Sequence, residues 1–244
     1  MNLLVEDLGL IDYEKAWKLQ GEYAAEIAEG TRPPTLLLLE HPHVYTFGRR
    51  GEAENLLWDA SELKSRNAAV HWVDRGGDVT YHGPGQLVGY PLIPLAPIRP
   101  SPAQHFDEEE RIPAADYVGY IRALEKSLII ALARMGVGAG QRTGKTGVWV
   151  QADVWSRCTR CRPEDKQKPA KLAAIGVKVD ARGVSRHGFA LNVDPDMSYW
   201  EGIIACGLAG EPVAALADLL DPVPEMQQVK REVESAFREV FEYA

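Results

Sequence analysis

The sequence predicts an α+β fold built on a mixed β-sheet flanked by helices. Short runs rich in β-branched and aromatic residues are interspersed with longer amphipathic segments, without a strict strand–helix–strand rhythm. The 244 residues are 45% hydrophobic and 25% charged, which is ordinary for a globular protein that buries a sizeable core. Because no repeat or low-complexity linker divides the chain, we expect a single domain over residues 1–244, with an insertion loop at about 151–170.

The first half of the chain is expected to alternate between helices and short strands. Asp12 is a favourable N-cap for a helix that runs to about Glu29 and stops at Gly30. A second, short helix is expected over residues 59–66. Four apolar runs are short enough to be strands, namely residues 35–39, 44–47, 70–73 and 87–93.

The second half begins with a charged, proline-rich connection over residues 96–113. Apolar residues at helical spacing then predict a long helix over residues 115–135. Strands are expected over residues 147–154, 172–179 and 189–193, with the first two paired. Helices over residues 213–220 and 225–241 should close the chain.

Charge and cysteine content exclude several classes of function. The net charge of −8 argues against a nucleic-acid binder. The first residues lack a basic region, and the apolar run at 36–39 is far too short to span a bilayer, so no membrane association is expected. Three cysteines do not form a disulfide framework, which favours a cytoplasmic location.

The most informative segment is the stretch from Arg75 to Gln86, which we call the glycine loop. It contains four glycines, a proline, an arginine and a histidine between two apolar runs. Glycine allows another backbone or a ligand to approach closely. The loop therefore indicates a ligand-binding site, although an ordinary hairpin connection would also use glycine and proline.

Cys206 and Lys171 are the candidate reactive side chains. Cys206 lies among small residues that leave its sulfur accessible, and a thiolate is a strong nucleophile. A buried cysteine can equally be a small apolar residue. Lys171 opens an apolar strand, where it could be a surface residue or could hold a nearby thiolate as an ion pair.

Two other motifs are not expected to be functional sites. Cys158 and Cys161 form a CxxC pair, but no second pair follows at the spacing of a zinc site, so we expect a decorated hairpin with two thiols. Residues 139–146 approach a phosphate-binding loop. That mechanism requires a strand before the loop and a helix after it, whereas the pattern here predicts the opposite order. No metal or cofactor is expected.

Taken together, the motifs resemble the lipoyl (octanoyl) transferases of lipoate biosynthesis. The long, specific signature is Arg75-Gly76-Gly77-x-x-Thr80-Tyr81-His82-Gly83-Pro84-Gly85-Gln86-x-x-x-Tyr90-Pro91. The matching segments also include residues 39–49, 146–150, 171–176, 187–192 and 206–210, so the resemblance extends from about Tyr13 to about Leu220. The insertion at 151–170 and the connection at 96–113 depart from it. The resemblance implies a fold related to the catalytic domains of biotin and lipoate ligases.

The resemblance also implies the reaction and its residues. An octanoyl group would pass from octanoyl-acyl carrier protein to a lysine of a lipoyl domain, through a thioester on Cys206 with Lys171 as its catalytic partner. Acceptors would be the lipoyl domains of 2-oxoacid dehydrogenase acyltransferase subunits and the glycine cleavage H-protein. The acyl group would be bound by Arg75, Gly76, Gly77, Asp78, Val79, Thr80, Tyr81, His82, Ala174, Ile175, Gly176, His187, Gly188, Phe189 and Ala190.

Two other functions are compatible with the same pattern. One is an ATP-dependent lipoate–protein ligase, in which the matching lysine would contact the nucleotide and Cys206 would be dispensable. The other is a non-catalytic module that binds the acyl group or its carrier. The two are separated from a transferase by whether ATP is needed and by whether the protein itself becomes acylated.

Overall fold

The computed structural model describes residues 2–95, 116–156, 158, 161, 163–205 and 210–244. A seven-stranded mixed sheet forms its centre, in the order β1-β2-β6-β10-β9-β8-β7. Only the β1–β2 pair is parallel in this sheet, and the other neighbours are antiparallel. The strands are β1 Leu4–Leu10, β2 Thr35–Glu40, β6 Gln86–Leu92, β7 Ala139–Arg142, β8 Lys145–Val150, β9 Ala170–Val179 and β10 Ser185–Asn192.

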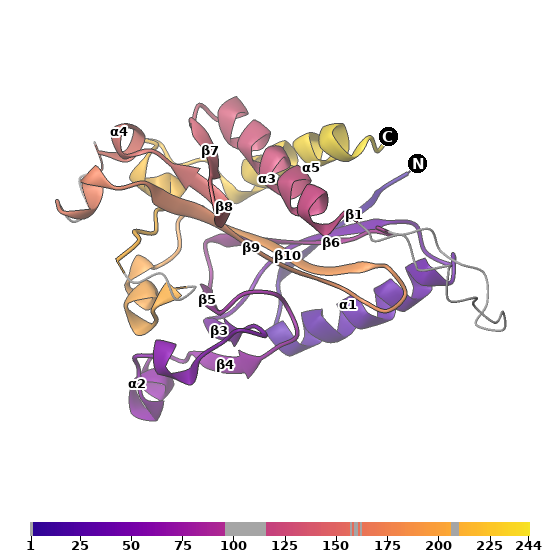
Figure 1. The fold of residues 1–244 in the computed structure, drawn as a ribbon, viewed down its shortest axis with the longest axis horizontal. Coiled ribbons are helices and arrows are strands. Elements are labelled where there is room, and N and C mark those ends of the chain that lie inside the picture. The colour runs from indigo at the N-terminus through magenta and orange to yellow at the C-terminus, as the bar shows by residue number, and fades with distance from the viewer. Residues whose placement is uncertain (1, 96–115, 157, 159–160, 162, 206–209) are drawn as a thin grey trace.

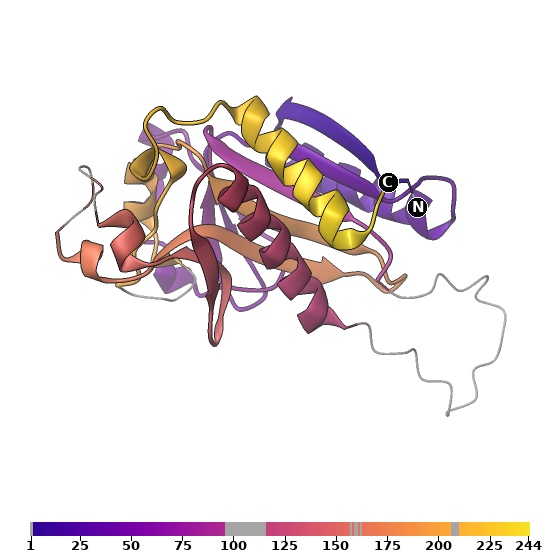
Figure 2. The ribbon, with the colours of Figure 1, turned by 90° about the horizontal axis from the view of Figure 1, so that it is seen from above.

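Helices cover both faces of this sheet (Figures 1 and 2). Helix α1, Tyr13–Ala28, packs on one face, while α3, Tyr117–Arg134, and α5, Met226–Phe241, lie together on the other. The α+β fold with a mixed sheet and flanking helices is therefore confirmed. No described helix is both long and apolar enough to cross a bilayer.

Strand β2 shows why the sheet is buried on both sides. Leu36 and Leu38 pack into the core beneath α3 and α5, whereas Leu37 and Leu39 pack into the core beneath α1. Alternate residues of a strand point to opposite faces, so a continuous apolar run is what a strand between two helical layers requires.

A three-stranded sheet, in the order β4-β3-β5, stands beside the large one (Figure 1). Its strands are β3 Val44–Phe47, β4 Ala69–Trp72 and β5 Val79–His82. The short helix α2, Ala60–Ser65, and the 3-10 turns η1, Ala53–Asn55, and η3, Met197–Gly202, lie beside it. Strand β5 lies inside the glycine loop, which the sequence predicted to be irregular throughout.

The start of α1 follows the predicted capping, and α2 begins in the same way. Asp12 accepts hydrogen bonds from the backbone N–H groups of Glu14 and Lys15 at the start of α1. Asp59 does the same for Ser61 and Glu62 at the start of α2. These side chains satisfy donors that the first turn of a helix leaves without a partner.

The expected helix over residues 213–220 is wrong, because only the 3-10 turn η5, Leu216–Asp218, forms there. The backbone before this turn is already engaged by β9. Lys171 N–H donates to Pro212 O at 2.9 Å, and Ala214 N–H donates to Lys171 O at 3.0 Å. A segment that supplies these bonds in an extended register is not available to a helix.

One other boundary differs from the expectation. The strand predicted over 147–154 ends at Val150, and the short helix α4, Ala152–Trp155, follows it. Strands β1 and β7 were not predicted, and the connection at 96–113 lies outside the described residues. Strands β7 and β8 form an antiparallel hairpin around residues 143–144, so the rejection of a phosphate-binding loop is confirmed.

The β8–β9 connection is the decorated hairpin that the sequence predicted, since the two strands are antiparallel neighbours. It carries α4 and the 3-10 turn η2, Asp165–Gln167. Two thiols were expected in it, but Cys158 and Cys161 are joined as a disulfide. Whether the whole chain is one domain stays a prediction.

Replacing Gly188 by Ala should destabilise the sheet. A Cβ there would lie 2.1 Å from Gly89 O on β6, far inside van der Waals contact. Gly140→Ala on β7 is the matched control, because nothing lies within 4 Å of its added Cβ. We expect a loss of about 3 kcal/mol in the free energy of unfolding for Gly188→Ala and little change for the control, measured by urea denaturation. Equal stability of the two variants would contradict the close packing of β10 on β6.

Candidate active site

The glycine loop lies directly against the backbone of β9. Gly76 N–H donates to Val177 O at 2.9 Å. A Cβ on Gly176 would lie 3.0 Å from Gly76 O and 3.2 Å from the Cδ of Arg75, so the absence of a side chain at Gly176 relieves crowding at this close approach.

Arg75 fixes the loop to the small sheet. Its side chain is buried, and its guanidinium donates to the hydroxyl and the backbone carbonyl of Thr46 on β3, and to Gly76 O. A guanidinium has a planar set of donors, so several bonds of this kind hold it in one orientation. Arg75 thus serves as an internal support, and it also lines the neighbouring cavity.

Asp78 holds the loop from its other side. Its carboxylate accepts hydrogen bonds from Glu52 N–H at 3.2 Å and from the Asn55 amide at 2.6 Å. The backbone of residues 48–50 adds bonds to the carbonyls of Asp78, Arg75 and Gly77. The glycine loop is therefore held on both sides before any ligand arrives.

These contacts leave a narrow, mostly apolar cavity, which we call the slot, between the loop and the strands β9 and β10. Thirteen of the fifteen residues expected to bind an acyl group line it: Arg75, Gly76, Gly77, Asp78, Thr80, His82, Ala174, Ile175, Gly176, His187, Gly188, Phe189 and Ala190. Val79 and Tyr81 alternate with them along β5, and their side chains pack into the cluster behind the small sheet.

Tyr13 and Tyr90 complete the slot, although neither was among the residues predicted to bind the acyl group. Tyr13 is the first residue of α1, and Tyr90 is on β6. The apolar spacing around each tyrosine indicates only that it lies on the buried face of its own helix or strand. A cavity between α1 and β6 can be recognised only once the two are packed together.

Lys171 lies in a second small cavity, which we call the lysine chamber. Its side chain is largely buried, and its Nζ lies 4.9 Å from the centroid of the Trp149 ring on the adjacent strand β8. An ammonium over an indole face is favourable, and it keeps the lysine facing the interior. The chamber is also lined by Thr80, Ala174, Trp200, Ala205, Glu211, Pro212 and Val213.

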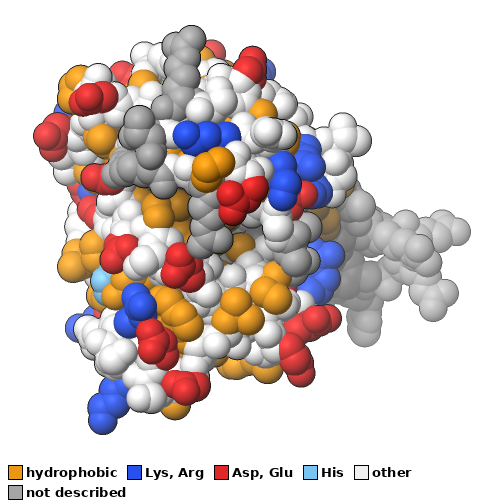
Figure 3. Space-filling model, turned by 90° about the vertical axis from the view of Figure 1, so that its left-hand side faces the viewer, with side chains coloured by type: hydrophobic (Ala, Val, Ile, Leu, Met, Phe, Trp, Pro, Cys, Tyr) orange, Lys and Arg blue, Asp and Glu red, His pale blue; other side chains and the backbone are white. Residues whose placement is uncertain are grey.

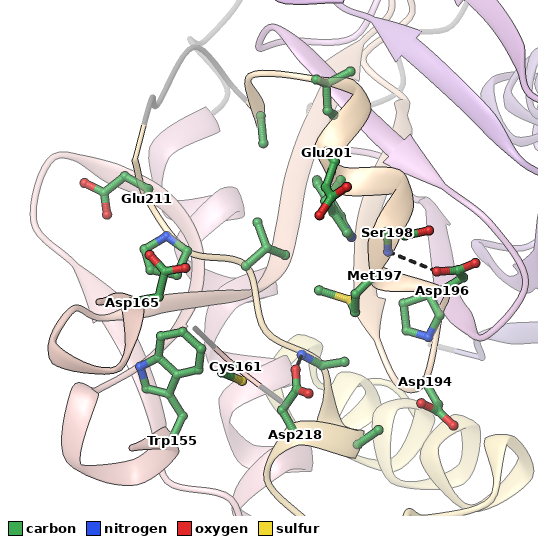
Figure 4. A pocket seen from close by; sticks show the side chains of 18 of the residues that line it. Trp155, Cys161, Asp165, Asp194, Asp196, Met197, Ser198, Glu201, Glu211 and Asp218 are labelled. Carbon is green, nitrogen blue, oxygen red and sulfur yellow. Dashed lines mark hydrogen bonds between the residues drawn. The ribbon is translucent and has the colours of Figure 1, made fainter. Parts of the chain in front are cut away.

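The slot and the chamber share two walls, Thr80 and Ala174. On its other side the chamber shares Trp200, Ala205 and the segment from Glu211 to Val213 with a larger, acidic hollow. This hollow is shown in Figure 4, and the side of the molecule that carries α4 and η3 faces the viewer in Figure 3. The three cavities therefore adjoin one another in the order slot, chamber and hollow.

Cys206 lies outside the described residues. The residues on either side of the undescribed segment 206–209 are Ala205, which lines the chamber and the hollow, and Gly210, which lines the hollow. The pairing of Cys206 with Lys171 therefore stays a prediction.

A chain of hydrogen bonds joins the glycine loop to the strand that carries Lys171. His82 Nδ1 is 2.7 Å from Gln86 Oε1, and Gln86 Nε2 donates to Asn192 Oδ1 at 2.8 Å. Asn192 Nδ2 donates to Ala214 O at 3.0 Å, and the N–H of Ala214 donates to Lys171 O. All of these side chains are buried, so the network fixes the loop relative to the lysine.

His187 is not part of this network and is held by Asp74 instead. Its Nε2 is 2.7 Å from Asp74 Oδ1, and its backbone N–H donates to Gln20 Oε1. Hydrogen bonding to His187 is the main cause that lowers the pKa of Asp74, while burial lowers the pKa of His187. The imidazole thus lines the slot in a fixed orientation.

Comparison with known proteins agrees with this architecture. Residues 12–238 match the family model of the lipoyl protein ligase A/B catalytic domain. The chain belongs to this family. An octanoyltransferase of Cytophaga hutchinsonii is 37% identical over 245 residues, which cover 94% of this chain and 88% of that protein. An octanoyltransferase of Solibacter usitatus is 42% identical over 218 residues, which cover 89% and 84%.

Solved structures of the family share the fold. A bipartite lipoate protein ligase from Thermoplasma acidophilum superimposes with a TM-score of 0.67 over 100% of this chain and 84% of that chain, at 16% identity. A lipoate-protein ligase A bound with ATP gives a TM-score of 0.65 at 15% identity, over 99% of this chain and 85% of that one. The predicted lipoate-ligase-like fold is confirmed.

Two neighbouring buried histidines should make the fold sensitive to acid. Burial lowers the pKa of His41 to about 4 and that of His82 to about 3. In the unfolded chain each would titrate near its ordinary value of about 6.5. As the pH falls from about 6.5 towards 4, the unfolded state takes up protons that the folded state excludes, so each histidine removes about 1.4 kcal/mol of stability per pH unit.

His41→Asn tests this pH dependence. The side-chain amide can still donate to Ile11 O, which accepts from His41 Nδ1 at 2.7 Å, but it cannot be protonated. Denaturation curves between pH 8 and pH 5 should show that the unfolding free energy of the variant falls less steeply with pH. The difference in slope should correspond to about one fewer proton taken up on unfolding. Parallel pH profiles for the variant and the parent would contradict this assignment.

Proposed function

We propose that this chain is an octanoyltransferase of lipoate biosynthesis, which moves an octanoyl group from octanoyl-acyl carrier protein to a lysine of a lipoyl domain. The curated relatives that bear the name octanoyltransferase support the reaction. In this structure the observation that supports octanoyl transfer is a pair of adjoining cavities. The apolar slot shares the lining residues Thr80 and Ala174 with the chamber that holds the buried Lys171.

The apolar lining of the slot suits the alkyl chain of the substrate. Each methylene moved from water to an apolar site contributes about 0.8 kcal/mol, so an eight-carbon chain supplies about 5 kcal/mol of binding. Gly76, Gly77 and Gly176 leave the space for it, and the rigid backbones on both sides limit its depth. A slot of fixed depth favours one chain length over shorter and longer ones.

The chemistry takes place in two half-reactions at Cys206. With Lys171 as its cationic partner, the thiolate attacks the thioester carbon and the bond to the carrier sulfur breaks. The carrier sulfur takes a proton from Lys171, and the carrier leaves as its thiol. The lysine amine of the acceptor then attacks the octanoyl-Cys206 thioester. An amide forms, the amine gives a proton back to Lys171, and the Cys206 thiolate is regenerated.

This sequence of steps requires no ATP. Exchange of one thioester for another is nearly isoenergetic, and conversion of a thioester to an amide is downhill. Two half-reactions at one thiol predict ping-pong kinetics. The glycine cleavage H-protein and the lipoyl domains of 2-oxoacid dehydrogenases are the proposed acceptors, and a cytoplasmic location is proposed for the enzyme.

Thr80 is placed to assist the chemical step. Its side chain lines both the slot and the chamber, where the thioester carbonyl would lie. The hydroxyl is buried, and it has no hydrogen-bond partner among the described residues. A buried donor of this kind can stabilise the negative charge that develops on the carbonyl oxygen in the transition state.

The first test is intact-mass measurement after mixing the protein with octanoyl-acyl carrier protein in the absence of ATP. We expect the parent chain to gain one octanoyl group that hydroxylamine removes. Cys206→Ser should gain no labile group, and Lys171→Ala should acylate at least tenfold more slowly. Lys126→Ala, an exposed lysine on α3, is the control and should acylate like the parent.

Two outcomes would contradict the transferase. If a lipoyl domain added as acceptor is acylated only with free octanoate and ATP, and still is by Cys206→Ser, the chain is a ligase. Binding of the octanoyl carrier without any covalent adduct would assign an acyl-binding module.

The second test concerns the Thr80 hydroxyl. Thr80→Val keeps the shape of the side chain but removes the donor, so turnover should fall by about 100-fold with little change in KM. Thr80→Ser keeps the hydroxyl and should retain most of the activity. Equal turnover in the Val and Ser variants would show that the hydroxyl does not act on the substrate.

A further inference from the structure

The acidic hollow carries a group of side chains that the proposed reaction does not use. Cys158, Cys161 and Asp218 place their sulfur and carboxylate atoms within 4.8 Å of one another. Figure 4 shows Cys161 and Asp218 side by side, to the right of Trp155. Cys158 is 3% exposed, while Cys161 and Asp218 are partly exposed to the hollow.

The sequence pattern does not identify a third ligand for this cysteine pair. The fold supplies it, because Asp218 ends η5, and this turn packs against the β8–β9 connection that carries both cysteines. One carboxylate oxygen of Asp218 accepts a hydrogen bond from Ala215 N–H at 2.8 Å. A carboxylate oriented in this way by a second bond is typical of a metal ligand.

The geometry agrees with a tetrahedral ion once the disulfide is reduced. Zn–S and Zn–O bonds of about 2.3 and 2.1 Å place the ligand atoms about 3.6–3.8 Å apart. The Cα atoms of the two cysteines are 5.6 Å apart, so side-chain rotation can separate their sulfurs to such a distance. The ligand atoms of all three side chains already lie within 4.8 Å of one another, so small side-chain movements can bring them to such separations.

We propose that Cys158, Cys161 and Asp218 form a site for a borderline-soft divalent cation such as Zn²⁺, which becomes available when the disulfide is reduced. A dithiol reductant supplies two electrons and two protons, and itself becomes a disulfide. The cation then displaces the two thiol protons and binds two thiolates and the carboxylate. Its fourth position faces the hollow and is filled by water.

Occupancy of this site would join two segments that lead to the proposed catalytic residues. The cysteines lie in the connection between β8 and β9, and Trp155 orders it by donating its Nε1–H to Lys168 O at 2.7 Å. Asp218 follows the segment whose backbone at Pro212 and Ala214 pairs with Lys171. The cation would therefore cross-link the β8–β9 connection to the segment whose backbone pairs with Lys171.

The test uses the full chain with Cys206→Ser, so that the CxxC cysteines are the only thiols. The protein is reduced with dithiothreitol, freed of it without oxygen, and titrated with ZnCl₂ and with CoCl₂. We expect one Zn²⁺ per chain, protection of two thiols from a thiol reagent, and a sulfur-to-cobalt charge-transfer band. The disulfide form should bind at least 100-fold more weakly.

Two variants assign the ligands. Asp218→Asn should weaken Zn²⁺ binding at least tenfold. Asp165→Asn, which alters another carboxylate of the same hollow, should leave it unchanged. Circular dichroism confirms that each variant is folded. Absence of stoichiometric uptake by the reduced chain would overturn the proposal, and so would equal affinities of Asp218→Asn and the parent. Neither result bears on octanoyl transfer, which depends on Cys206.

Discussion

The close approach of polypeptide backbones around β9 and β10 is the constraint on which the rest of the structure depends. On β10, Gly188 lies so near β6 that an added Cβ would fall 2.1 Å from Gly89 O. On β9, Gly176 lets the glycine loop form its backbone bond to Val177. Glycine at these positions lets three layers of main chain come together, and the space that remains between them is the slot.

The buried polar groups of the site, several of which line the slot, form hydrogen bonds around this backbone packing. The hydrogen-bonded series from His82 through Gln86 and Asn192 reaches the strand that carries Lys171. Each member of the series is buried, and each has a partner. A buried network of this kind is stable only in one arrangement, so it fixes the distance between the loop and the lysine.

The sequence could predict the parts of the site that local patterns control. Helix α1 begins at its predicted cap, and thirteen of the expected acyl-binding residues surround one cavity. Local patterns cannot show the contacts made across the fold. The segment before η5 has an apolar pattern typical of a helix, yet its backbone bonds to Lys171 make it extended. Tyr13, Tyr90 and Asp218 acquire their neighbours only when distant segments pack together.

The most direct test of the central claim is a crystal structure of the octanoyl-acylated protein. We expect the alkyl chain to lie in the slot between the glycine loop and the backbone of Ala174 to Gly176. Its carbonyl group should lie in the chamber, beside Lys171 and the Thr80 hydroxyl. An alkyl chain bound instead in the acidic hollow beside Glu201 and Asp218, with the slot closed, would contradict the account.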